Sequence, residues 1–167
     1  DVTTTNDNVT FAGATTLTGN VAVSTGTGGG VIAFTNTLNA TNANTQTLTL
    51  TAGTGNIDFD NTIGAGTALG AITVASGGTT TPTQSVAANG VAITSSNIVL
   101  AAAADITSNA VVTLTGTIAT QGDVTTTNDN VTFAGATTLT GNVAVSTGTG
   151  AGVIAFTNTL NATNANT

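Results

Sequence analysis

The seven aspartates carry all the ionisable side-chain chemistry that this chain of 167 residues can offer. Lys, Arg, His, Cys and Tyr are absent, so acid–base catalysis near neutral pH would rest on aspartate alone. No serine has a base in this chain to activate it as a nucleophile. We therefore predict that the protein is not an enzyme and has no catalytic residues.

Asp58 and Asp60 have the spacing that comes closest to a metal site. At positions i and i+2 of a strand, their side chains leave the same outward face, roughly 7 Å apart. Together with Asn61 and backbone oxygens they could supply part of the roughly six to eight oxygen ligands that Ca²⁺ takes. The other interpretation is a solvated face that keeps the protein soluble. We predict no metal site and no cofactor, with Ca²⁺ at Asp58 and Asp60 as the open alternative.

The charge balance argues against two classes of partner. The net charge is −7 and there is no cationic side chain. Binding to nucleic acid depends on Lys and Arg, and so does attraction to an anionic membrane surface. The longest apolar run, Ile98 to Ala104, has seven residues, whereas roughly 20 are needed to span a bilayer. We predict no nucleic-acid partner and no membrane insertion.

A long internal repeat organises the chain. Residues 1–45 return at 123–167 with a constant offset of 122 residues, and the one difference is that Gly29 becomes Ala151. Residues 1–122 are thus one full period, and residues 123–167 start the next without a linker. Stacked units bury their apolar faces against their neighbours. We therefore expect a continuous shaft whose partners are further repeats of the same chain or other copies, end to end or side by side.

The residue types favour strands throughout. Thr, Val and Ile are abundant, and their β-branched side chains favour extended backbone over helix. Short strands are predicted between Gly and Asn turns, which include Asn6 to Asn8 and its copy Asn128 to Asn130. Pro82 lacks an N–H, so we place it in a loop or at a sheet edge. Ala101 to Ala104 reads as a corner packed with small side chains. The class is all-β.

A shorter repeat inside the long one favours a particular architecture. Gly26 to Leu38 is echoed by Gly53 to Ile63, about 25 residues later, as a glycine turn followed by a strand and an Asn turn. One period holds about six strand–turn units of about 20 residues. A parallel β-solenoid, or β-helix, stacks such units about 4.8 Å apart. The alternative is a tandem array of immunoglobulin-like β-sandwiches, for which three Phe per period and no Trp or Tyr make a thin core.

Two stretches carry a resemblance to a known family. They are TLTLTAGTGNIDFDNTIG, Thr47 to Gly64, and GTALGAITVASGGTT, Gly66 to Thr80. They resemble the repeats of very large bacterial surface proteins, namely filamentous-haemagglutinin-like adhesins and related autotransporter-type exoproteins. The resemblance covers most of the period. It implies a secreted, right-handed β-helical shaft that holds something away from a cell or forms a fibre.

Threonine triplets add a further comparison. The Thr-x-Thr sequences that start at Thr16, Thr47 and Thr113 resemble the threonine rows of ice-binding β-helices. Alternation in any threonine-rich strand produces the same triplets, and coils of unequal length would spoil a flat lattice. We do not predict ice binding.

These observations lead to one functional expectation. We expect an extracellular, secreted structural protein that forms a β-solenoid shaft, stalk or filament at a bacterial cell surface or in a matrix. Each coil leaves a strand edge on which the next coil can add, and the sequence has no Lys and one Pro to blunt such an edge. The alternative is an adhesin array of immunoglobulin-like domains that binds a surface or a glycan.

Overall fold

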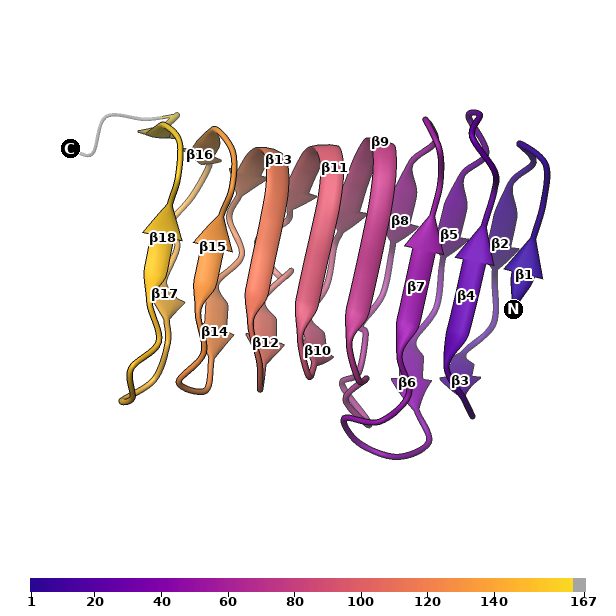
Figure 1. The fold of residues 1–167 in the computed structure, drawn as a ribbon, viewed down its shortest axis with the longest axis horizontal. Coiled ribbons are helices and arrows are strands. Elements are labelled where there is room, and N and C mark those ends of the chain that lie inside the picture. Colours follow the sequence, from indigo (N-terminus) through magenta and orange to yellow (C-terminus); the bar gives the residue numbers. More distant parts are fainter. Residues whose placement is uncertain (164–167) are drawn as a thin grey trace.

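Short parallel strands are stacked along the whole length of the molecule (Figure 1). The computed structural model describes residues 1–163, and these contain strands, turns and bends but no helix. The strands, in chain order, are β1 (Val2–Thr3), β2 (Val9–Phe11), β3 (Thr15–Leu17), β4 (Val21–Ser24), β5 (Ile32–Phe34), β6 (Leu38–Ala40), β7 (Leu48–Thr51), β8 (Ile57–Phe59), β9 (Ile72–Pro82), β10 (Val86–Ala88), β11 (Val91–Leu100), β12 (Ile106–Ser108), β13 (Val112–Thr120), β14 (Val124–Thr126), β15 (Val131–Phe133), β16 (Thr137–Leu139), β17 (Val145–Ser146), β18 (Ile154–Phe156) and β19 (Leu160–Ala162).

The strands form three faces, which we call face 1, face 2 and face 3. Face 1 contains β1, β4, β7, the first halves of β9, β11 and β13, then β15 and β18. Face 2 contains β2, β5, β8, the second halves of β9, β11 and β13, then β16 and β19. Face 3 contains β3, β6, β10, β12, β14 and β17, with Ile63 bridging Leu38 and Val86.

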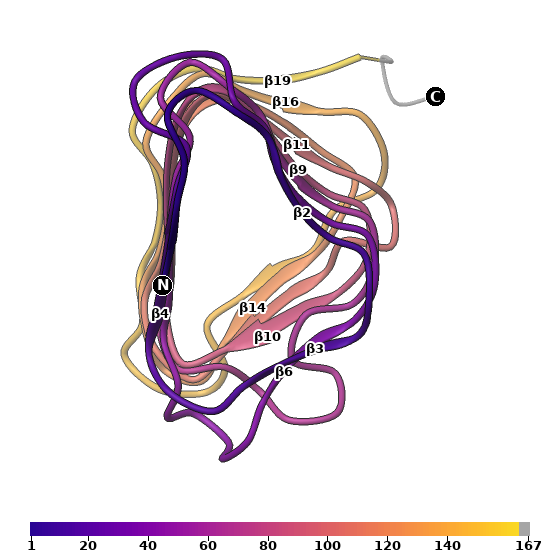
Figure 2. The same ribbon diagram turned by 90° about the vertical axis from the view of Figure 1, so that its right-hand side faces the viewer.

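The chain passes through the three faces in turn and so builds a β-solenoid of eight coils. In Figure 1 the chain rises along the front on face 1 and returns behind it, while the coils advance from the N-terminal to the C-terminal end. The end-on view of Figure 2 shows the triangular path of the backbone that results. The coil is right-handed, since in Figure 1 the chain rises on the near side, returns on the far side and advances from right to left. The predicted solenoid is therefore confirmed, and the immunoglobulin-like alternative is wrong because every strand pair in residues 1–163 is parallel.

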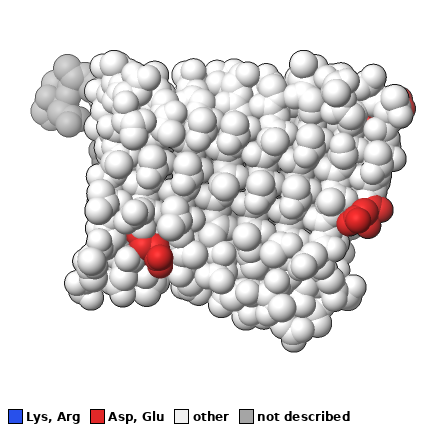
Figure 3. Space-filling view, in the orientation of Figure 1, with Lys and Arg blue, Asp and Glu red and all other residues white. Residues whose placement is uncertain are grey.

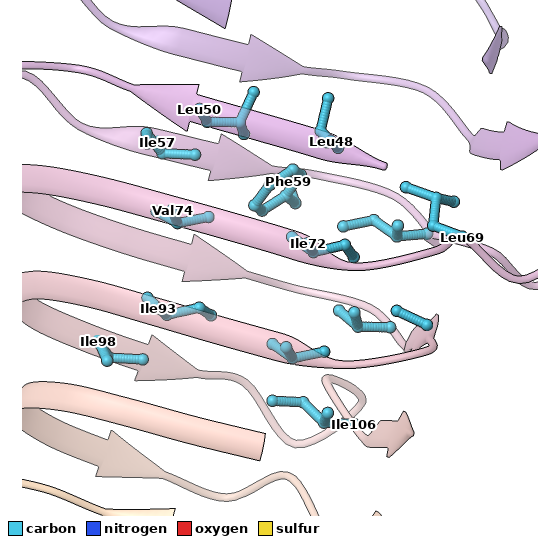
Figure 4. Close-up of a cluster of buried hydrophobic side chains, with 14 of the residues drawn as sticks. Leu48, Leu50, Ile57, Phe59, Leu69, Ile72, Val74, Ile93, Ile98 and Ile106 are labelled. Atoms are coloured by element: carbon cyan, nitrogen blue, oxygen red, sulfur yellow. The ribbon is translucent and has the colours of Figure 1, made fainter. Parts of the chain in front are cut away.

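Alternating side chains fill the interior of the triangle. In the short strands of the interior coils, such as β7 and β8, the residues with buried side chains are separated by one exposed or half-buried residue, as the period of two requires. Figure 4 shows Leu, Ile, Val and Phe side chains from successive coils packed above one another. Three phenylalanines of face 2 stack in a ladder, with centroid distances of 4.5 Å from Phe11 to Phe34 and 5.6 Å from Phe34 to Phe59.

The internal echo of the sequence corresponds to one coil. β5 pairs with β8 so that Ile32 lies against Ile57 and Phe34 against Phe59. These partners are the matching residues of the two echoed segments. Coils nevertheless differ in length, since successive members of one inward column are 19 to 27 residues apart. The column is Val2, Val23, Leu50, Val74, Ile93, Leu114, Phe133 and Phe156.

The long repeat does not contain a whole number of coils. Val2 lies on face 1 in the first coil, whereas its copy Val124 lies on face 3 in the sixth coil. One period of 122 residues therefore spans five coils and two of the three faces of the next. The predicted number of about six coils per period is close to this value. Because the period is one face short of six coils, the strands of the second copy lie on other faces than those of the first.

Two predictions about single sites have different outcomes. Ala101 and Ala104 do form a corner, closed by a hydrogen bond of 2.9 Å from the Ala104 N–H to the Ala101 carbonyl, and Ala104 is buried. Placing Pro82 in a loop or at an edge is wrong. Pro82 is the last residue of β9, is buried and pairs with Phe59 of β8, and its carbonyl accepts from the Ala101 N–H on the next coil. The ladder between β9 and β11 ends at Thr80 and Ile98, so the missing N–H of Pro82 falls beyond that ladder.

Candidate functional site

Asp58 and Asp60 lie at the surface of face 2, on and just after β8. Ile57 and Phe59 point into the core, so the half-buried Asp58 side chain points outward, and Asp60 is exposed. Burial raises the pKa of the Asp58 carboxyl above its ordinary value, and the negative charge of Asp60 raises it further. The two carboxylates therefore interact, as their spacing predicts.

The rest of a metal site is not assembled around this pair. Within residues 1–163 no group of three or more His, Cys, Asp or Glu side chains is placed to hold a metal ion. Asp58 pairs in register with Ala33 on one side and Thr81 on the other, so neither neighbouring coil adds a carboxylate. The predicted absence of a metal site and the alternative of Ca²⁺ binding at Asp58 and Asp60 both stay untested.

A different role for Asn and Asp becomes visible in the structure. A side chain directly before a strand accepts a hydrogen bond from a backbone N–H on the next coil. The donor N–H belongs in each case to the residue just before the strand position that pairs with the start of the first strand. For example, Asn8 precedes Val9, and its Oδ1 accepts from the Val31 N–H at 2.8 Å. We call these contacts inter-coil brackets. They are Asp1 to Ala22, Asn8 to Val31, Asn20 to Thr47, Asn56 to Thr79, Asp105 to Asp123, Asp123 to Ala144 and Asn130 to Val153.

The brackets satisfy backbone N–H groups that lie one residue before the paired ladder between two coils begins. Each such hydrogen bond contributes about 1 kcal/mol in typical proteins. They are not predicted from the sequence, where Asn8 and Asn130 are interpreted as turn residues and no contact is given to the other bracket residues. The signal that could have found them is an Asn or Asp directly before a strand, with a second strand start one coil later.

The Asn-Asp-Asn segments are turns, as predicted. Asn6 and Asn128 both have φ of 66°, a left-handed conformation that Asn tolerates better than most residues. The Asn6 Oδ1 also accepts from the Gly28 N–H at 2.6 Å. A Cβ on Gly28 would lie 2.5 Å from the Asn6 amide, so this corner needs glycine opposite the asparagine.

Outward threonines lie on more than one face. Thr16 belongs to β3 on face 3, whereas Thr49 of β7 and Thr113 of β13 belong to face 1. On face 1 the outward column interrupts Thr with Ala and runs Ala22, Thr49, Thr73, Ala92, Thr113 and Thr132. Figure 3 shows this side of the shaft as a nearly uncharged surface, with acidic atoms only toward its two ends.

The first and last coils of residues 1–163 each have a neighbouring coil on one side only. Ile154 and Leu160, in the last coil, are 41% and 47% exposed, whereas their copies Ile32 and Leu38 are fully buried. At the other end Val2 is 36% exposed and its copy Val124 is fully buried. The ends therefore present the apolar side chains and unpaired strand edges that every interior coil covers.

Comparison with known proteins adds no identification. No family model, no curated protein and no solved structure matches this chain. In residues 1–163 there is also no helix of the length and apolarity needed to cross a membrane. The resemblance to bacterial surface-protein repeats stays a prediction from the sequence.

Proposed function

We propose that the protein is a non-catalytic structural shaft, secreted and displayed at a bacterial cell surface or in a matrix. One observation carries this proposal. The second copy of the repeated segment adds to the same stack as the first period: β14 pairs with β12, and β15 pairs with β13. Duplication of the sequence therefore lengthens the shaft rather than adding a separate domain.

The way in which stacked coils stabilise one another supports a role that depends on the length of the shaft. The core is a column of Leu, Ile, Val and Phe, and each coil buries its side chains against the coils before and after it. Burying one such side chain contributes about 1.5–3 kcal/mol. Stability in such folds is the sum of similar neighbour contacts, so the shaft can extend without a new core. Every interior coil pairs with a coil on each side, so a further coil of the same kind, from the same chain or from another copy, can add to the stack in the same way.

The surface supports a passive role. Outward positions on face 1 are mainly Thr, Ser and Ala, and the side chains of the chain carry seven negative charges and no positive ones. Proteases that cut after Lys or Arg find no site in this sequence. Such a surface suits an exposed fibre.

Location and shape can be tested together on the source cells. Antibodies raised against this chain should label intact cells, and immunogold particles should mark thin extensions at the surface or material between cells. Fibre diffraction of the purified assembly should give a strong axial spacing of about 4.8 Å. Labelling that requires permeabilised cells would overturn the extracellular location. Diffraction without the axial spacing would overturn the shaft.

A further inference from the structure

The two copies of the repeated segment make the same contacts on different faces. Asp1 brackets Ala22 at 2.8 Å on face 1, and Asp123 brackets Ala144 at 2.7 Å on face 3. Phe11 stacks on Phe34 at 4.5 Å on face 2, and Phe133 stacks on Phe156 at 4.5 Å on face 1. The segment therefore makes the same contacts when its strands lie on a different set of faces.

The direction of the change is the same for every strand of the segment. β1, β2 and β3 lie on faces 1, 2 and 3, while their copies β14, β15 and β16 lie on faces 3, 1 and 2. The strands β4, β5 and β6 and their copies β17, β18 and β19 show the same displacement. Each copy is thus moved back by one face relative to the path of the chain.

We propose that the period is built as a screw. In a tandem array each period is turned by one third of a turn about the shaft relative to the one before. The same residues of the period then return to the same side of the shaft only after three periods. Three periods are 366 residues and 17 whole coils. This inference rests on the proposed shaft and adds the arrangement of its surface.

The screw has a consequence for partners that bind along the side of the shaft. At about 4.8 Å per coil, one period rises about 27 Å and three periods rise about 82 Å. A partner domain of about 100 residues has a radius of gyration of about 13 Å, so neighbours 27 Å apart on one side would crowd each other. On sides one third of a turn apart they would not. Any surface site of the period is thus presented on three sides of the shaft in turn.

Spin-label distances in the full chain test the screw directly. The chain has no cysteine, so double-cysteine variants label at two chosen sites only. One variant joins Thr10→Cys to Thr132→Cys, the same position in two periods, on faces 2 and 1. The control joins Thr10→Cys to Thr138→Cys, both in one outward column of face 2 and six coils apart.

The screw predicts an inverted order of distances. The two labels of the control pair are separated by more residues and lie about 29 Å apart along the axis. The two labels of the first pair lie on different faces as well as in different coils, so the first pair should show the longer mean distance. If the mean distance of the first pair is equal to or shorter than that of the control pair, the screw is wrong, whereas the shaft is not contradicted. Both distances far below the axial value would overturn the shaft and the screw together.

An array lengthened with further copies of residues 1–122 tests the full three-period repeat. Monovalent streptavidin on a biotinylated Thr10→Cys of each period should appear on three sides in turn by electron microscopy. Markers on the same side should be about 82 Å apart. Markers that all lie on one side would overturn the proposal.

Discussion

The two copies of the repeated segment, residues 1–41 and 123–163, have the same sequence apart from one residue but do not have the same surroundings. The first copy starts the stack, and its strands β4, β5 and β6 are covered by the next coil. The second copy ends the described stack, and its β18 and β19 have no coil above them. The brackets and the phenylalanine stack recur in both copies, whereas the exposed fraction of the side chain is 0% at Leu38 and 47% at its copy Leu160. Burial in this fold is thus a property of position in the stack rather than of sequence.

The largest difference between equivalent substitutions in the two copies, measured as a change in the free energy of unfolding, is expected at a glycine. A Cβ on Gly13 meets nothing within 4 Å, but a Cβ on its copy Gly135 would overlap the Gly116 carbonyl oxygen of the coil below. Gly135→Ala should therefore lower the free energy of unfolding by about 3 kcal/mol or more, because backbone must move. Gly13→Ala should be neutral or stabilise by up to about 1 kcal/mol. Urea unfolding followed by circular dichroism measures both, and equal effects would show that Gly135 does not lie against Gly116.

The next comparison uses a buried leucine and its exposed copy. Leu38 lies between Thr15 and Ile63 of the adjacent coils, so Leu38→Ala should cost about 2–5 kcal/mol of unfolding free energy. Leu160→Ala should cost less than about 1 kcal/mol, since much of that side chain already meets water. The same unfolding assay compares the two. A large loss from Leu160→Ala would mean that another copy covers the last coil in solution, which sedimentation at several concentrations would detect.

The brackets should behave alike in both copies. Asn8 and Asn130 each accept one backbone hydrogen bond at 2.8 Å, so Asn8→Ala and Asn130→Ala should each cost about 1 kcal/mol. Asn8→Asp and Asn130→Asp keep an acceptor oxygen and serve as matched controls, with losses below about 0.5 kcal/mol. Hydrogen exchange of the Val31 and Val153 amides provides a second readout. If the alanine variants leave exchange at these amides unchanged, the brackets do not exist in solution.

The smallest effect is expected at Asp58, which has no second copy in this chain. Its pKa is raised in the folded state, first by burial and then by Asp60, so the folded protein holds the proton more tightly than the unfolded chain does. The free energy of unfolding should therefore fall as the pH rises from below the ordinary pKa of aspartate through the raised value. Asp58→Asn should remove this fall, and Asp60→Asn should reduce it. A fall that persists unchanged in Asp58→Asn would assign it to other carboxyls.

The sequence by itself determined the class and the repeating unit. β-Branched residues between Gly and Asn turns predicted an all-β chain, and the echo of Gly26 to Leu38 at Gly53 to Ile63 predicted stacked coils, which the pairing of Ile32 with Ile57 confirms. The absence of cationic and sulfur-containing side chains limited the possible chemistry. Local preferences and composition are enough for these conclusions, because they depend on neighbours along the chain.

Only the tertiary structure decided which face each residue occupies. That choice depends on the lengths of all preceding corners, and these differ widely, as the single Gly116 within β13 and the long turns from β4 to β5 and from β6 to β7 show. The sum of such lengths leaves one period a third of a turn short of six coils, so that Val2 and Val124 lie on different faces. The brackets and the buried position of Pro82 follow from the same stacking. Contacts one coil apart join residues about 20 positions distant, and no local pattern fixes their register.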